Sequence, residues 1–275
     1  MRTVEPHRIV RFIMRSRSNA GSLFLLLVAS CGGASARGED GVEKLADDAT
    51  AQQSYEDALA DFRDDRCIDA EPSFRQVRRE FPYSRFAALA ELRIADCLLM
   101  QDSHAEAIQA YRQFVRFRPS HPEVPYARFK VAQAYYDQIP TSWFLVPPSY
   151  ERDQEPTRQA LSKLRRFVVD FPEDPRIQEA KEMSERCLRL LAQHEFAIAK
   201  FYRRQEADRA VIIRLRTLLR TYEGSGLEPE ALWMLGQAHV RMDQVDLARE
   251  AFRELISRFP QSEPAQKARE AVRRL

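Results

Sequence analysis

The chain has 275 residues, of which 44% are hydrophobic and 31% charged, with a formal net charge of +2, a composition typical of a folded protein rather than a disordered one. It holds only 8 glycines, and none lies between Val42 and Glu223. β-Hairpin turns of types I′ and II′, Rossmann dinucleotide-binding motifs and phosphate-binding loops all need glycine, so this stretch carries none of them. A glycine-poor, arginine-rich chain with 15 prolines favours helices separated by proline-containing turns.

The N-terminal residues 1–30 have the features of an export signal in the usual order. Arginines precede the apolar run Leu23–Ala29, which is far shorter than the ~20 residues that a membrane-spanning helix needs. The residues Val28–Cys31 resemble a bacterial lipobox, in which the cysteine is acylated and becomes the mature N-terminus. The sequence therefore predicts a lipoprotein signal peptide at 1–30 and a covalent lipid on Cys31. The alternative is a secretory signal with an incidental cysteine, and Met14 is a second candidate start.

The lipid predicts where the protein is located. Acyl chains on Cys31 would hold it on a membrane, and Gly32 in place of Asp after the cysteine resembles the bacterial sorting signal for the outer membrane, facing the periplasm. Small and polar residues at 31–48 predict a flexible tether. Loss of residues 1–30 removes five arginines and one glutamate, which changes the formal net charge from +2 to −2. We expect no nucleic-acid binding from an exported protein of this charge.

A recurrent turn divides the remaining chain into repeats. An aromatic residue recurs at positions 81, 117, 171, 222 and 259, within two residues of a proline in all copies but the fourth. Two of the spacings are close to 34 residues, the period of the tetratricopeptide repeat. In the last copy Gly236, Ala248 and Phe252 also match that repeat, with small residues where two helices cross and an aromatic ring beside them. The pattern predicts an all-α fold, an α-solenoid of about five tetratricopeptide-like helical-hairpin repeats.

The predicted repeat domain covers 49–275. Its repeats are expected at about 51–84, 88–121, 124–174, 176–225 and 229–262, followed by a capping helix at 263–275. The fourth repeat should have a long first helix, because residues 176–191 contain no turn signal. The third contains an insert at 139–155 that is apolar but rich in proline, which excludes a continuous helix. Trp143 and Phe144 of this insert are expected either to cover a gap in the core or to bind a partner.

No catalytic or metal-binding pattern stands out. The five histidines are scattered, and His194–Glu195 lacks the second histidine of a zincin motif. Gly224–Gly226 lies at a repeat turn, where glycine ends a helix, and lacks the flanks of a nucleophile elbow. We therefore expect no enzyme activity, no metal and no cofactor besides the lipid. Cys67 and Cys97 either form a disulfide between neighbouring helices or are small buried side chains.

Several stretches resemble the BamD family of lipoproteins of the outer-membrane β-barrel assembly (BAM) complex. They are His121–Pro122 with Tyr126, Arg152–Pro156, and Arg186–Tyr202 continuing to Leu215. The resemblance implies a non-catalytic scaffold whose C-terminal repeats bind a periplasmic POTRA domain of the barrel-forming subunit BamA. It implies that the N-terminal repeats help to receive unfolded outer-membrane proteins or other BAM lipoproteins. It also places the family's POTRA-pairing arginine at Arg214, for which the alternative is a solvated arginine on a helix face.

Two other classes of protein share parts of this pattern. A periplasmic adaptor resembling the Tol-Pal coordinator has similar C-terminal repeats, but that family usually has an N-terminal coiled coil and no lipobox. A lipid-anchored peptidoglycan enzyme would need a catalytic domain, and the repeats leave no residues for one. The lipobox and the missing heptads favour the BAM lipoprotein.

Overall fold

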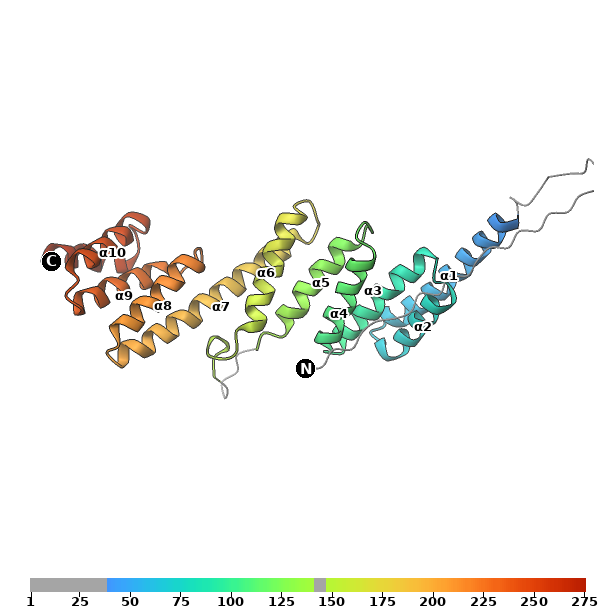
Figure 1. The fold of residues 1–275 in the computed structure, drawn as a ribbon, viewed down its shortest axis with the longest axis horizontal. Helices are drawn as coiled ribbons and strands as arrows, with labels where there is room; N and C mark the ends of the chain where they lie inside the picture. The colour runs from blue at the N-terminus through green and yellow to red at the C-terminus, as the bar shows by residue number, and fades with distance from the viewer. Residues whose placement is uncertain (1–38, 141–146) are drawn as a thin grey trace, which may run out of the picture. The chain divides into compact units, whose positions relative to one another are not determined.

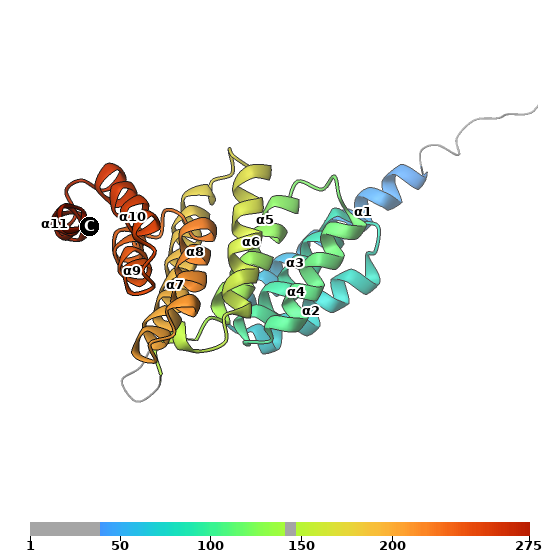
Figure 2. The same ribbon diagram turned by 60° about the vertical axis from the view of Figure 1, so that its left-hand side comes forward.

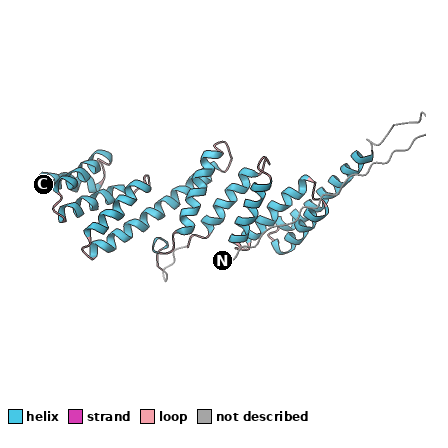
Figure 3. Cartoon of the chain, in the orientation of Figure 1, coloured by secondary structure: helices cyan, strands magenta, loops and turns pink. Residues whose placement is uncertain are grey.

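A computed structural model describes residues 39–140 and 147–275. These residues form helices joined by turns, and no strand occurs among them (Figure 3). The helices in chain order (Figure 1) are α1 Glu39–Arg63, α2 Cys67–Glu80, α3 Arg85–Met100, α4 His104–Phe117, α5 Val124–Asp137, the 3₁₀ helix η1 Ser149–Glu151, α6 Glu155–Asp170, α7 Ile177–Arg204, α8 Asp208–Thr221, α9 Glu228–Arg241, α10 Val245–Arg258 and α11 Glu263–Arg274. No described helix is both long and apolar enough to cross a membrane.

The chain divides into two compact units, Met1–Val42 and Glu43–Leu275, and the repeats lie in the second. Within it each helix from α2 to α10 packs against the next, as α5, α6 and α7 do in Figures 1 and 2. Short loops join most successive helices, which therefore form helical hairpins. The predicted all-α fold of tetratricopeptide-like hairpins is confirmed.

The core is a series of small clusters, each shared by three or four successive helices. One joins α1 to α3, the next α3 to α5, then α5 to α7, α7 to α10, and α9 to α11. Small residues allow close crossings between the helices. Gly236 of α9 lies directly against the ring of Phe252 on α10, and a Cβ atom at this position would overlap that ring. The Leu-Gly pair of the repeat pattern is thus a packing requirement.

Four turns between paired helices share one backbone conformation. The second residue after the helix has a positive φ of 56° to 57°, and these residues are Asp65, Asp102, Glu206 and Asp243. In each turn the next N–H donates to the carbonyl five residues earlier, as Ser103 does to Leu98 at 2.9 Å. This is the Schellman arrangement, in which glycine usually occupies the left-handed position. The glycine-poor repeats therefore end their first helices with acidic residues instead.

The start of α1 differs from the sequence-based expectation. The helix begins at Glu39, so residues 39–48, expected as part of a flexible tether at 31–48, are helical. Alanine, glutamate and lysine in this stretch have high helix propensity. The predicted signal peptide at 1–30 and the predicted lipidation site Cys31 lie outside the described residues.

Candidate functional site

Arg214, the arginine expected to bind a partner, lies on α8 and pairs with α7. Its Nη1 donates to Glu195 Oε2 at 3.4 Å, and the side chains are 40% and 11% exposed respectively. A partly exposed pair of this kind contributes only ~0–1 kcal/mol to stability. The pair instead positions the arginine. The buried carboxylate of Glu195 holds the guanidinium in one place, and part of the guanidinium stays open to solvent. The neighbouring Ile213 is 63% exposed.

The proline-rich insert is attached to the same part of α7. His194 Nδ1 donates to the carbonyl oxygen of Tyr150 in η1 at 2.6 Å. Gln154, which is only 2% exposed, donates to two backbone carbonyls of the insert at 2.7 and 2.9 Å. The bond from His194 fixes the C-terminal end of the insert to α7, while those from Gln154 hold the insert's own backbone together.

Trp143 and Phe144, the insert residues expected to cover the core or bind a partner, lie outside the described residues. The insert is described at residues 139–140 and again from Pro147, where it runs through η1 into α6. Asp153 lies just before α6, and its Oδ1 accepts from the N–H of Glu155, the first residue of that helix, at 3.0 Å. This bond and those of Gln154 give the Arg152–Pro156 stretch a structural role as the base of the insert.

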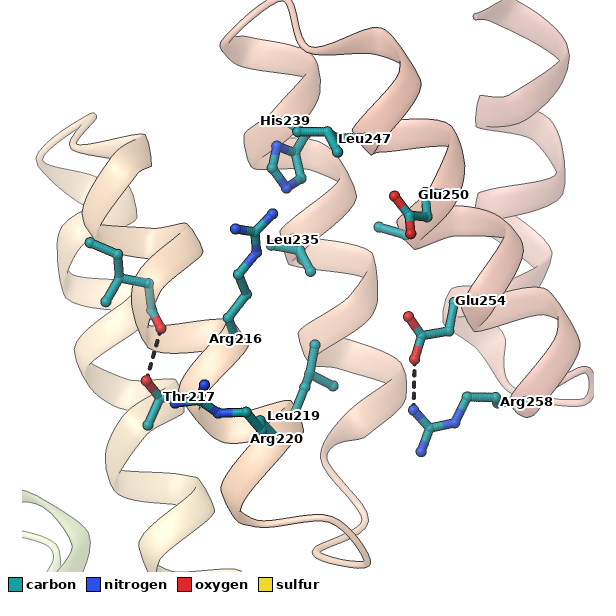
Figure 4. A pocket seen from close by; sticks show the side chains of 12 residues that line it. Arg216, Thr217, Leu219, Arg220, Leu235, His239, Leu247, Glu250, Glu254 and Arg258 are labelled. Atoms are coloured by element: carbon teal, nitrogen blue, oxygen red, sulfur yellow. Dashed lines mark hydrogen bonds and ion pairs between the residues drawn. The ribbon is translucent and has the colours of Figure 1, made fainter.

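A groove of about 570 Å³ opens between α8, α9 and α10 (Figure 4). Leu235 and Leu247 lie among its apolar lining residues, and Ile213 belongs to its α8 side. Its charged residues are Arg216, Arg220, Glu250, Glu254 and Arg258. Arg258 donates to Glu254 at 2.7 Å, and this hydrogen bond raises the pKa of the arginine. The groove therefore combines apolar surface with fixed charges of both signs, as protein–protein interfaces do.

The groove is a feature that sequence reasoning missed. Its signal is the apolar run Val211–Ile212–Ile213, where the helical period allows only part of the run to face the core. Val211 and Ile212 are buried, whereas Ile213 is out of phase and exposed. An exposed isoleucine beside an arginine on a repeat helix indicates a contact surface.

Comparison with known proteins decides the family. The family model YfiO, described as an outer membrane lipoprotein, matches residues 47–251. The chain belongs to the YfiO family. Similar proteins include the outer membrane protein assembly factor BamD of Caulobacter vibrioides, 29% identical over 61% of this chain and 52% of that protein. The match therefore spans about half the length of the Caulobacter relative. BamD of Neisseria gonorrhoeae is 23% identical over 80% of this chain and 83% of that protein.

Solved structures give a weaker likeness. MamA from Desulfovibrio magneticus is 14% identical with a TM-score of 0.35, and covers 78% of this chain and 97% of its own. The protein TTC0263 of Thermus thermophilus, a tetratricopeptide-repeat protein, is 15% identical with a TM-score of 0.34, over 82% of this chain and all of that one. At these scores the likeness adds nothing to the fold described above.

Tyr126, one of the residues that resemble the YfiO family, belongs to a buried polar cluster. Its hydroxyl donates to Asp96 Oδ1 at 2.7 Å, and Tyr111 donates to the same oxygen. Arg93 Nη1 donates to Asp96 Oδ2 at 2.6 Å. Burial raises the pKa of both tyrosines, so they remain neutral hydrogen-bond donors. The carboxylate links α3, α4 and α5, which indicates a structural role rather than a reactive site.

Proposed function

We propose that this YfiO-family protein is a non-catalytic, lipid-anchored scaffold of the outer-membrane β-barrel assembly complex. The family match and the relatives named as assembly factors support the assembly role. Cys31 would carry the lipid and hold the repeats on the periplasmic face of the outer membrane. The N-terminal repeats would help to receive unfolded outer-membrane proteins, or contact other lipoproteins of the complex.

The partner proposed for the C-terminal repeats is a periplasmic POTRA domain of a BamA-type barrel subunit. The observation that carries this proposal is the pairing of Arg214 with Glu195, which orients a partly exposed guanidinium on α8, the helix that also contributes Ile213 to the groove. A guanidinium that is already oriented loses little side-chain entropy when it binds a partner carboxylate. Arginines beside apolar pockets are frequent energetic centres of interfaces.

The Arg214→Glu variant tests this proposal. We expect the recovery of BamA in a crosslinked pull-down from outer membranes to fall at least ~10-fold, since an interface centre is worth more than ~1.4 kcal/mol. The melting temperature should stay within a degree or two, because the Glu195 pair contributes little to stability. The lipid anchor is tested separately, by whether the repeat protein is itself recovered with the outer membranes.

Arg209→Glu is the matched control, since Arg209 is exposed on the same helix and changes the charge equally. It should leave BamA recovery unchanged. Equal recovery of BamA with wild type and Arg214→Glu, at equal melting temperature, contradicts the role of this arginine. Recovery of Tol or Pal proteins alone would overturn the assignment to the assembly complex.

A further inference from the structure

Three sulfur atoms meet where α2 begins and α3 ends. Cys67 is the first residue of α2, and Cys97 and Met100 lie one turn apart on the same face of α3. The thiol of Cys67 lies 3.4 Å from Met100 Sδ, and Cys67 and Cys97 belong to the same core cluster. The three cysteines of the described chain, Cys67, Cys97 and Cys187, are free. The structure therefore places a free thiol in contact with a thioether, and a second free thiol in the same core cluster.

The cluster is buried on one side and open on the other. Cys97 and Cys67 are 0% and 5% exposed, whereas Met100 is 47% exposed. A small ion can thus reach the thiols past the methionine side chain.

The ligand types decide which ion fits. Thiolate and thioether sulfur select Cu(I), while a thioether is not among the usual ligands of zinc. Metal–sulfur bonds of ~2.3 Å in a trigonal site place the sulfurs roughly 4 Å apart. The present separation of 3.4 Å between Cys67 and Met100 requires a small outward movement, which the exposed methionine can make. Among the described residues, side chains of His, Cys, Asp and Glu alone form no group of three or more that could hold a metal ion.

We propose that Cys67, Cys97 and Met100 form a Cu(I) site. Binding replaces the two S–H bonds by two copper–sulfur bonds and releases both protons to solvent, and no electron is transferred. The affinity should therefore rise with pH. This inference goes beyond the proposed function, since the cluster lies in the N-terminal repeats and involves none of the residues around Arg214.

The test uses the full-length protein in detergent and Cu(I) kept reduced by ascorbate. We expect one Cu(I) per chain, held against a competing Cu(I) chelator, and a higher melting temperature with the metal. Cys67→Ser and Cys97→Ser should abolish this binding, and Met100→Leu should weaken it at least ~10-fold because only the thioether is lost. Cys187→Ser is the matched control, since that buried thiol has no second thiol beside it, and should bind like wild type. Zn²⁺ should not be retained.

Three results overturn the proposal. The first is a Cys67–Cys97 disulfide in the exported protein, seen as loss of two titratable thiols. The second is Cu(I) binding that survives in Cys67→Ser and Cys97→Ser, and the third is Met100→Leu with wild-type affinity. Circular dichroism and melting without metal establish that each variant is folded. If the serine variants are unfolded, Met100→Leu decides the question, because it keeps both thiols.

Discussion

Glu206 is the least favourable residue among the four left-handed turn positions. Its φ is 57°, and the turn closes when the N–H of Ala207 donates to the carbonyl of Tyr202 at 3.1 Å. A left-handed conformation costs a residue with a side chain ~1–2 kcal/mol, and aspartate tolerates it better because its short side chain bonds locally. The other three positions have aspartate. Only this turn combines the strained conformation with a longer side chain.

Glu206→Gly should therefore raise the free energy of unfolding by ~1 kcal/mol, because glycine adopts a positive φ without steric cost. Gln205→Gly is the control. Gln205 has a φ of −90°, so glycine there should only add entropy to the unfolded chain and lower stability by ~0.5–1 kcal/mol. Urea unfolding measures both. A loss of stability in Glu206→Gly equal to that of Gln205→Gly would show that the turn is not strained.

At the scale of elements, the beginning of α9 is held by a buried carboxylate. Glu228 is 3% exposed and accepts from the N–H groups of Gly224 at 2.6 Å, Ser225 at 3.0 Å and Gly226 at 2.9 Å. Positive φ angles of 85° and 84° at the two glycines turn these N–H groups inward. The result is a backbone anion site occupied by the protein's own side chain.

Glu228→Gln should lower the free energy of unfolding by ~1–3 kcal/mol, because the amide has one accepting oxygen where the carboxylate has two, so at least one N–H of the turn loses its charged acceptor. Glu230→Gln is the matched control, since Glu230 is exposed in the same first turn of α9. Its effect should stay within ~0.5 kcal/mol. Equal effects of the two variants in denaturant unfolding would mean that the dipole of α9, not the turn, determines the contribution of Glu228.

At the scale of the molecule, the core clusters follow one another along the chain, and α11 covers the last of them. Ala265 and Ala268 of α11 are fully buried against Leu232, Phe252 and Leu255 of α9 and α10. Without this helix the apolar face of the fifth repeat would be open to water. Terminal helices of repeat proteins are needed for this reason.

Removal of residues 263–275 should therefore loosen the C-terminal repeats alone. We expect faster hydrogen exchange in α9 and α10 and unchanged exchange in α2 to α5, because packing terms extend only to neighbouring helices. Lys267→Ala, which replaces an exposed side chain of the same helix, should leave hydrogen exchange unchanged in both groups of helices. Uniformly faster exchange throughout the chain would show that the repeats unfold as one unit.

The fold could be predicted from the sequence because its signals are local. Aromatic and proline residues recur at the helix ends, and the missing turn signal at 176–191 accounts for the 28 residues of α7. The start of α1 could not be predicted from the sequence, because small polar residues are compatible with both a flexible tether and a helix. At the site, Arg214 came from family resemblance, and its partner Glu195 was missed. The contacts of Glu195 with Arg214 and of Glu228 with its turn depend on tertiary packing. Because acidic residues are common in this chain, the sequence alone does not show which of them make such contacts.

The helices from α2 to α10 pack mainly against their neighbours in the chain, which also bears on how two partners could share the chain. No described helix of the N-terminal repeats packs against α8, α9 or α10. A ligand at one end would thus change the other end's affinity only through a relay of intervening hairpins, which makes a large coupling free energy difficult to achieve. Occupancy at the two ends would follow each partner's own concentration. Such a scaffold would tolerate either order of arrival, so that assembly need not follow a fixed sequence of steps.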